Sequence, residues 1–392
     1  MNQSFYPLAM DNWGQEEIAA ANKVLDSKLL TMGKTVEEFE RVVASKFGSK
    51  HAVMVNSGSS ANLLMLAAMR VYTSAKIENP KNIVVPAVSW STTFTPAYYL
   101  NYELRFVDID IESFGIATQL VESAIDENTV AILAVNILGS ACDLWKLQEI
   151  ASKHGIWLLE DNCESMGASL KGRHTGTFGR MASHSSFYSH HINTMEGGWI
   201  TTDDSDLLQI LKSLRAHGWT RSLPDDSPLR PQKKIEEFNT QFEFILPGLN
   251  FRPLEIEAAI GLVQLKKFDE MLGTRQRNAK IFMDLFQKLN GVRTQIPLGE
   301  SSWFAFALIF ESTKIRNQVA KLLRDNLIEC RPIIAGNFTR QRALDYLNFK
   351  VCSELTNSNT LHDCGLYIGN HPTDLSNELI FTHKLLSQFD FQ

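Results

Sequence analysis

Hydrophobic positions in the first part of the chain follow two different spacings. Helical spacing over residues 15–27, and again from Thr35 to Phe47, predicts two amphipathic helices. From residue 52 onward, short apolar runs typical of buried strands alternate with amphipathic runs. This alternation is typical of a mostly parallel sheet covered by helices on both faces. Strands are predicted at Ala52–Val55, Ile83–Pro86, Leu104–Asp110, Ala131–Leu138, Ile156–Asp161, His184–Tyr188 and Trp199–Thr202, and helices at Ala61–Met69, Leu120–Ile125 and Lys146–His154.

The pattern becomes richer in helix after about Asn250. Two helices are predicted over residues 255–272 and 276–289. A smaller mixed unit follows, with strands at 304–310 and 329–332 around a helix at 315–325. We therefore predict a large α/β domain over residues 1–250 and a small C-terminal α+β domain over residues 251–392.

Composition and charge exclude several classes of protein. The chain has 392 residues and a net charge of −6, which argues against a nucleic-acid-binding protein. The N-terminus has no basic segment followed by an apolar one, so no signal peptide is predicted. The longest uncharged stretch, residues 82–102, contains Pro86 and Pro96, so it does not predict a membrane span. We expect a cytoplasmic protein that acts away from membranes.

The cysteines of the chain are few and far apart. Five occur, without any CxxC pair. This spacing favours reduced thiols in a cytoplasmic enzyme, and it argues against a disulfide framework, a zinc ribbon or an iron–sulfur cluster. The five are Cys142, Cys163, Cys330, Cys352 and Cys364.

A serine-rich turn, Asn56–Asn62, lies between a predicted strand and a predicted helix. Backbone N–H groups at a helix N-terminus, with hydroxyls and a glycine nearby, are suited to binding a phosphate. The same turn could also be a serine-rich helix cap that binds nothing. No GxGxxG or P-loop pattern occurs, so dinucleotide and Walker-type sites are not predicted.

A carboxylate, Asp161, ends another predicted strand. Side chains at the carboxyl ends of parallel strands face the crevice in which α/β proteins bind their ligands. A carboxylate there can hold a protonated ring nitrogen of a cofactor, although it could instead cap the next helix.

Two adjacent histidines, His190 and His191, precede the Gly197–Gly198 pair. Neighbours on a strand point to opposite faces, and no third ligand stands at metal spacing, so a metal site is not predicted. One histidine is expected to act as a general base, and the other to be structural.

These segments, in this order and at these separations, resemble the DegT/DnrJ/EryC1/StrS sugar aminotransferase family. The resemblance covers nearly the whole chain. It implies an aspartate-aminotransferase-like fold (fold type I), pyridoxal 5'-phosphate as the cofactor and a nucleotide-linked keto sugar as the substrate. It rests on the Asn56–Ser59 turn, Pro86–Trp90, Val107–Asp110, Glu160–Asp161 and Glu196–Gly198.

The chain departs from the family at one position. Six residues before Glu196 the family has the lysine that binds the cofactor covalently, whereas this chain has His190. No lysine occurs between Lys171 and Lys212. In this respect the chain is similar to the family's 3-dehydratases of deoxysugar biosynthesis, such as that of colitose for lipopolysaccharide O-antigens. A related branch carries a cysteine-ligated iron–sulfur centre, which the sparse cysteines argue against.

The resemblance implies a dehydratase that uses pyridoxamine 5'-phosphate. His190 would remove a proton from the cofactor methylene, the C3 hydroxyl of a 4-keto-6-deoxy sugar would leave, and glutamate would restore the cofactor's amine. Two alternatives remain: an aminotransferase that acts without its lysine, and a non-catalytic dimer that binds a nucleotide sugar or the cofactor. His191 is the rival base, because counting forward from Phe187 selects it.

The resemblance also implies which residues bind the cofactor and the substrate. Gly58, Ser59 and Ser185 would hold the phosphate, Trp90 would stack on the pyridine ring and Asp161 would pair with its N–H. Glu164 would lie near the cofactor, where relatives have Gln or His, and Asn250 would reach the phosphate bound by the partner subunit of a homodimer. The arginines of the substrate set could instead form surface ion pairs. The implied substrate contacts are Asp26, Ser27, Lys28, Leu29, His217, Arg221, Arg252 and Glu329.

Overall fold

A computed structural model describes residues 4–73, 81–221, 223–230 and 242–391. Within them the main sheet has eight strands, and the strands at its centre are parallel, as predicted. Only β9 runs antiparallel to both of its neighbours, β1 and β8. In spatial order the strands are β1 (His51–Val55), β9 (Gly198–Thr202), β8 (Met181–Ser185), β5 (Trp157–Asp161), β4 (Thr129–Val135), β2 (Lys81–Pro86), β3 (Tyr102–Val107) and β13 (Phe349–Val351).

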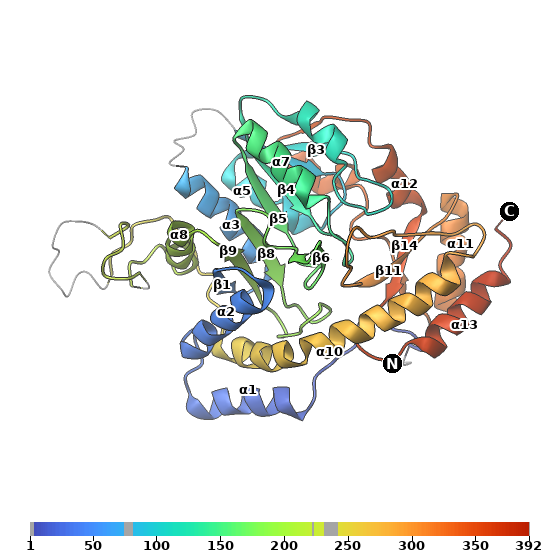
Figure 1. Ribbon diagram of the computed structural model, residues 1–392, viewed down its shortest axis with the longest axis horizontal. Helices are drawn as coiled ribbons and strands as arrows, with labels where there is room; N and C mark the ends of the chain where they lie inside the picture. The colour runs from blue at the N-terminus through green and yellow to red at the C-terminus, as the bar shows by residue number, and fades with distance from the viewer. Residues whose placement is uncertain (1–3, 74–80, 222, 231–241, 392) are drawn as a thin grey trace.

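Helices cover both faces of this sheet (Figure 1). Side chains alternate between the faces of a strand, so Val53 packs in one core with α3 and α8 while Met54 packs in another with α2 and α10. A third core joins Val84 and Ile132 to α7. The helices of this part are α1 (Gln15–Ser27), α2 (Lys34–Phe47), α3 (Gly58–Tyr72), α4 (Ser91–Phe94), α5 (Pro96–Leu100), α6 (Thr118–Val121), η1 (Glu122–Ala124), α7 (Leu144–His154) and α8 (Ser205–Arg215).

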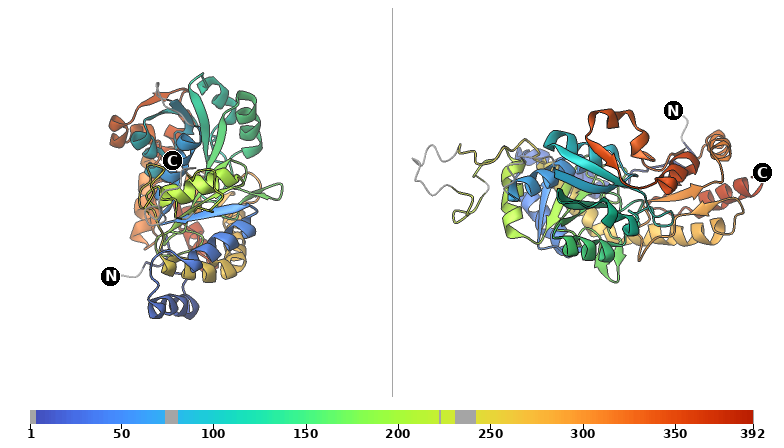
Figure 2. Two further views of the ribbon diagram at one scale, coloured as in Figure 1. Left: turned by 90° about the vertical axis from the view of Figure 1, so that its left-hand side faces the viewer. Right: turned by 90° about the horizontal axis from the view of Figure 1, so that it is seen from above.

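A smaller antiparallel sheet lies beyond one end of the main sheet (Figure 1), in the C-terminal part of the chain that Figure 2 draws in orange and red. Its core contains Phe282, Phe306 and Leu366, and Tyr6 from the start of the chain joins it. The strands, in spatial order, are β10 (Arg293–Thr294), β11 (Ala305–Ile309), β14 (Gly365–Gly369) and β12 (Cys330–Arg331). The other elements are α11 (Thr313–Asp325), η2 (Phe338–Arg340), η3 (Arg342–Tyr346), α12 (Thr356–Cys364), α13 (Ser376–Ser387) and a hairpin of β6 (Ser169–Leu170) and β7 (Arg173–His174).

The helix α10 (Glu255–Phe286) joins the two sheets and corrects one prediction. Two helices were expected on either side of residues 273–275, but the structure has one helix of 32 residues. Its first half packs against α1 and α2, and its second half packs against α13 (Figure 1). Gly273 costs about 1 kcal/mol in a helix interior, which packing at both ends offsets.

The predicted domain division at residue 250 remains a prediction, and the structure adds two connections across it. The residues Ala258 and Phe268 of α10 belong to a core of the large domain, whereas Phe282 belongs to the core of the small one. From the C-terminal part, β13 returns to the main sheet and pairs with β3. The two parts are therefore tied together at more than one place.

Strand ends also differ from the predictions. The strand expected at His184–Tyr188 is β8, which ends at Ser185, and the strands expected to reach Asp110 and Leu138 end at Val107 and Val135. The chain leaves the sheet early at these places and forms turns, and Leu138 has a positive φ of 53°. The turns after β4 and β8 carry side chains into the site described below. None of the described helices is long and apolar enough to cross a membrane.

Candidate active site

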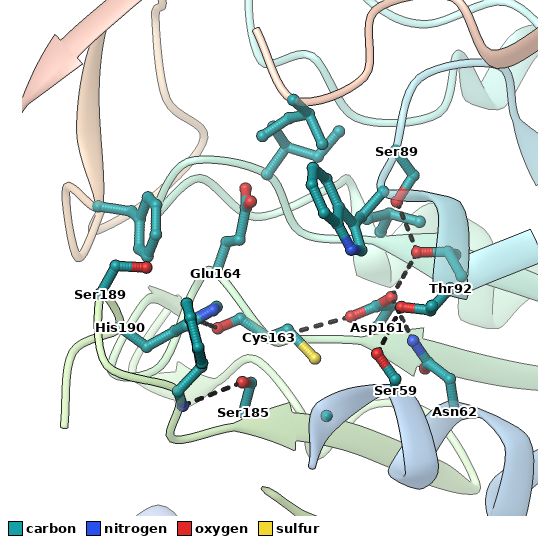
Figure 3. A pocket seen from close by; sticks show the side chains of 18 of the residues that line it. Ser59, Asn62, Ser89, Thr92, Asp161, Cys163, Glu164, Ser185, Ser189 and His190 are labelled. Carbon is teal, nitrogen blue, oxygen red and sulfur yellow. Dashed lines mark hydrogen bonds between the residues drawn. The ribbon is translucent and has the colours of Figure 1, made fainter. Parts of the chain in front are cut away.

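A pocket of about 340 Å³ lies at the carboxyl ends of the central strands (Figure 3). Asp161 ends β5, Ser185 ends β8, and Gly58 begins α3 just after β1. The small domain closes the pocket with Phe304, Arg331 and Tyr367, among others. Ligands of open α/β sheets bind at this edge, so the position agrees with the expectation from the sequence.

The first turn of α3 forms one wall. The Ser57 hydroxyl caps the helix by accepting a hydrogen bond from the Ser60 amide at 3.1 Å, so the capping alternative holds for that serine. Ser57, Ser59 and Ser185 all line the pocket. A Cβ on Gly58 would lie 2.7 Å from the Ser185 Cβ, so only glycine allows this close approach. The wall combines a helix N-terminus with two hydroxyls, a donor set that fits a phosphate.

Asp161 lies on the same wall, only 5% exposed, and three donors orient its carboxylate. The Asn62 amide and the Thr93 hydroxyl donate to Oδ2 at 2.8 and 2.7 Å. The Cys163 backbone N–H donates to Oδ1 at 3.2 Å. Trp90 also lines the pocket, and its side chain is 49% exposed. A fixed carboxylate and an open indole face suit a flat, protonated heteroaromatic ring.

The two adjacent histidines lie in different environments. His190 lines the pocket, and its Nδ1 lies 2.8 Å from the Cys163 carbonyl oxygen (Figure 3). Because a carbonyl only accepts, Nδ1 carries the proton, and Nε2 keeps a free lone pair. Burial lowers the pKa of His190 to about 4; the Cys163 carbonyl and Asp161 oppose the shift and Arg275 adds to it. At neutral pH this imidazole is a neutral base.

His191 is 2% exposed and is not among the residues that line the pocket. Its Nε2 lies 3.2 Å from the Ser302 carbonyl oxygen. Burial lowers its pKa well below the usual value. This placement suits the structural role expected for one member of the pair.

Glu164 is a half-buried carboxyl group in the pocket (Figure 3). Its Oε2 accepts a hydrogen bond from the Leu138 amide at 3.2 Å. Burial raises its pKa to about 7; the neighbouring Asp161 raises it further, while the Leu138 amide and Arg331 oppose the shift. Both protonation states are therefore accessible near neutral pH.

Several side chains of the pocket were not expected from the sequence. Arg331 is exposed and makes no ion pair among the described residues, and its guanidinium lies 5.7 and 5.6 Å from the ring centres of Trp90 and Tyr367. It stands inside the strand predicted at 329–332, where no motif distinguished it. The other missed residues that line the pocket include Asn62, Ser89, Thr92, Thr93, Asn136, Phe187, Ser189, Glu196, Phe304 and Tyr367.

The predicted substrate residues and Asn250 do not line this pocket. Asp26 to Leu29 lie at the exposed C-terminal end of α1. His217, Asn250 and Arg252 are neighbours, because Ala216 pairs with Asn250, whose Oδ1 accepts from the Arg252 Nε at 3.0 Å. Arg221 is exposed. Glu329 accepts hydrogen bonds from Ser4 and Leu8 and is exposed.

Comparisons with known proteins identify the family of the chain. The sequence model of the DegT/DnrJ/EryC1/StrS aminotransferase family matches residues 11–380. The chain is 46% identical over 377 residues to a GDP-4-keto-6-deoxy-D-mannose 3-dehydratase of Yersinia pseudotuberculosis, covering 95% of this chain and 96% of that one. It is 44% identical to the Escherichia coli O55:H7 protein of the same name over 97% of this chain and 99% of that one.

Solved structures give the same result. The structure of the E. coli dehydratase with bound hydrated pyridoxal phosphate superimposes with a TM-score of 0.94 at 44% identity, covering 98% of this chain and 100% of that one. A histidine-to-asparagine variant of a GDP-4-keto-6-deoxymannose-3-dehydratase with bound GDP-perosamine gives a TM-score of 0.93 at 44% identity, over 97% and 100% of the two chains. A Helicobacter pylori aminotransferase involved in the biosynthesis of pseudoaminic acid, at 22% identity and TM-score 0.85 over 97% of this chain and 98% of that one, shares the fold.

Proposed function

Since the chain belongs to the DegT/DnrJ/EryC1/StrS aminotransferase family, we propose that it is a 3-dehydratase that uses pyridoxamine 5'-phosphate. The substrate is GDP-4-keto-6-deoxy-D-mannose, the product is the 3,6-dideoxy-4-keto sugar, and glutamate restores the cofactor's amine. The enzyme works as a homodimer in the cytoplasm. Relatives of this name, at 44–46% identity over nearly the full length, support the substrate.

One observation carries the proposal: a histidine stands in the pocket where an aminotransferase needs a lysine. His190 lines the pocket, and no lysine is among the described residues that do. Without a lysine, the chain cannot bind the cofactor covalently or relay protons through an amine. Ser189 precedes His190, and in a dehydratase variant of known structure the substituted histidine also follows a serine. This shared order favours His190 over His191 as the base.

The residues of the pocket fit the cofactor. The first turn of α3, with Ser59 and Ser185, would hold the phosphate, and Asp161 would pair with the pyridine N–H. Trp90 would cover one face of the ring, and Glu164 would lie beside it. When bound, pyridoxamine phosphate supplies an amine that reacts with a ketone, and a ring that withdraws electrons.

His190 supplies the proton transfers that elimination needs. Its free Nε2 accepts a proton as a neutral base, and the Cys163 carbonyl stabilises the imidazolium that results through Nδ1–H. The same imidazolium can then protonate the C3 hydroxyl as it leaves. Three donors hold the Asp161 carboxylate in place, so its negative charge stays at the same position during this exchange.

The substrate and the partner subunit account for the residues that lie outside the pocket. In a homodimer, Asn250, with its neighbours His217 and Arg252, would complete the site of the other subunit. Arg221 and Arg331 would offer positive charge to the diphosphate of the sugar nucleotide. A relative of this fold binds GDP-perosamine, a molecule of the same nucleotide class.

Absorbance spectroscopy of the purified protein with pyridoxal phosphate tests the proposal. We expect a band of free aldehyde, no borohydride-trapped lysine adduct, and conversion to the pyridoxamine form on addition of glutamate. With the GDP sugar, the 3-deoxy product and ammonia should follow. A trapped lysine adduct, or transamination without loss of the C3 hydroxyl, would instead establish the aminotransferase.

The substitution His190→Lys gives a second test in the same assay. A restored lysine should allow a covalent cofactor and favour transamination, with loss of dehydration. His191→Lys is the matched control, because that side chain does not line the pocket. If only the His191 variant gained a covalent cofactor, the roles of the two histidines would be reversed.

A further inference from the structure

Two aromatic rings and one hydrogen bond surround the His190 imidazole. Phe187 meets it edge-on at 6.1 Å between ring centres, and Phe304 lies against it at 5.2 Å with an angle of 55° between the planes. The hydrogen bond from Nδ1 to the Cys163 carbonyl fixes one ring nitrogen. Phe187 is 42% exposed, whereas Phe304 is half-buried, so Phe304 is the firmer of the two aromatic contacts.

Phe304 belongs to a segment, Ser301–Phe304, whose backbone is strained. Trp303 has a φ of 47°, in the left-handed region that side chains of its size rarely adopt. Such strain costs about 1–3 kcal/mol and persists only where the surroundings impose it. One side of the segment is held by the turn after β4, because the amides of Ser302 and Phe304 donate to the carbonyls of Gly139 and Leu138 at 3.0 and 3.1 Å.

Arg275 of α10 holds the other side of this segment. Its Nη1 donates to the Phe304 carbonyl at 3.2 Å and also to the Asn370 carbonyl. The Asn370 side chain donates in turn to the Trp303 carbonyl at 2.7 Å. The guanidinium of Arg275 therefore holds the Phe304 carbonyl, and the amide of Asn370 holds the Trp303 carbonyl.

Arg275 is an unusual group to find in this position. It is 4% exposed and makes no ion pair with any carboxylate among the described residues. Burial lowers its pKa to about 10, so it is still charged at neutral pH. A buried cation without a counter-ion is expensive, and a neutral donor would be sufficient to bind two carbonyls. Its positive charge also lowers the pKa of His190 and His191.

We propose that Phe304, held by Arg275, is a positioning residue that keeps the His190 ring where Nδ1 donates to Cys163 and Nε2 faces the pocket. Phe304 fixes the plane of the imidazole, and Arg275 fixes Phe304. His191 contacts the same segment from the other side, through the Ser302 carbonyl and the Phe304 ring at 5.7 Å. This inference rests on the proposed role of His190 as the base.

The test is ¹⁵N NMR of the full chain labelled at histidine, with and without pyridoxal phosphate, beside steady-state kinetics. His190→Asn identifies the His190 signals. In the unmodified protein we expect a single tautomer with the proton on Nδ1. In Phe304→Ala we expect signals that move toward the average of two tautomers, and a kcat lower by roughly 10- to 100-fold with little change in KM. Phe304→Tyr should restore both.

Phe306→Leu is the matched control. This buried phenylalanine of β11 stacks on Phe282 at 4.3 Å, inside the core of the small domain. It should lower stability and leave the His190 tautomer unchanged. Arg275→Met should reproduce the Phe304→Ala spectrum; if that variant does not fold, the Phe304 variants decide.

Two outcomes would overturn the inference. One is an unchanged His190 tautomer in folded Phe304→Ala, whatever happens to kcat, because any loss of rate would then have another cause. The other is the same tautomer change in Phe306→Leu, which would mark a general loosening. Retained dehydration in His190→Asn would contradict the role of His190 as the base, and no dehydration by the unmodified protein would contradict the proposed function. In either case the NMR comparison would still report separately on the contact with Phe304.

Discussion

The folded chain places two sets of predicted residues differently: those expected to bind the cofactor and those expected to bind the substrate. Gly58, Trp90, Asp161 and His190 come from four segments and converge on one pocket. Asp26 to Leu29, Arg221 and Glu329 are scattered over exposed surface. Apart from Asn250, the cofactor set lies along a single sheet edge, whereas the substrate set does not line that pocket. A shared site in a homodimer would explain the difference, and the following experiments test it.

Among the residues that converge on the pocket, the largest effect on activity is expected for the general base, His190. His190→Asn should lower kcat by about 100- to 10,000-fold, because the general base is lost while a side chain of similar size remains. Release of ammonia from the cofactor's amine, with the GDP sugar, glutamate and the cofactor in excess, measures it. His191→Asn is the matched neighbour and should retain most of the activity. Equal losses in both variants would contradict the division of roles.

The carboxylate of Asp161 is expected to contribute to the affinity for the cofactor. Asp161→Asn should weaken pyridoxal phosphate binding by about 100- to 1,000-fold, because a buried charge loses its partner. Titration of the cofactor absorbance measures the Kd. Asp108→Asn is the control: it is equally buried at 5% exposed, but it accepts from the amides of Asn357 and Ser358 at the start of α12. It should lower stability with little effect on the Kd.

A smaller effect is expected for the set outside the pocket, and it bears directly on the dimer. Asn250→Ala should weaken cofactor binding by about 10- to 100-fold, the value of one hydrogen bond to a charged phosphate. At a cofactor concentration that saturates the unmodified enzyme but not the Asn250→Ala variant, a mixed dimer with a His190→Asn subunit has one site with both intact residues, so it should show about half of the unmodified activity. Dimers that show only the average of the two parents would indicate sites built from single subunits.

The smallest effect is expected in the pH profile. A histidine base must be neutral, and an ordinary one, with a pKa near 6.5, would lose most of its activity as the pH falls to 5.5. The pKa of His190 is about 4, so its acid limb should appear only as the pH falls toward that value. A change of activity near pH 7 is instead expected from the titration of Glu164, whose pKa is about 7, and Glu164→Gln should remove that change. A limb near 6.5 that persists in that variant would contradict the lowered pKa.

The sequence predicted the alternating elements well because each has a local cause. The helix at Gln15–Ser27 has the predicted bounds, and the turn at Asn56–Asn62 begins α3. The break near residue 273 failed because a glycine's local cost is smaller than the packing at the two ends of α10. The early ends of β4 and β8 were missed because apolar turn residues have the same composition as a buried strand.

The site was predictable where a motif stands at a strand or helix end, as at Asp161 and Ser59, and in the loop that carries His190 between β8 and β9. Arg331, Tyr367 and Phe304 carried no such pattern, because their importance comes from the docking of the small domain over the pocket. Sequence spacing also left His190 and His191 open. Burial separates them, since one ring lines the pocket and the other is enclosed beside Ser302.

The sequence by itself determined the order of strands and helices, the serine-rich turn at the start of α3, the carboxylate at the end of β5 and the absence of a lysine before Glu196. These depend on residue type and near neighbours. Only the tertiary structure decided which histidine faces the pocket, how its tautomer is set and which small-domain residues close the site. Those features depend on burial and on contacts between segments over 100 residues apart, such as Ser302 with His191, and local spacing carries no information about either.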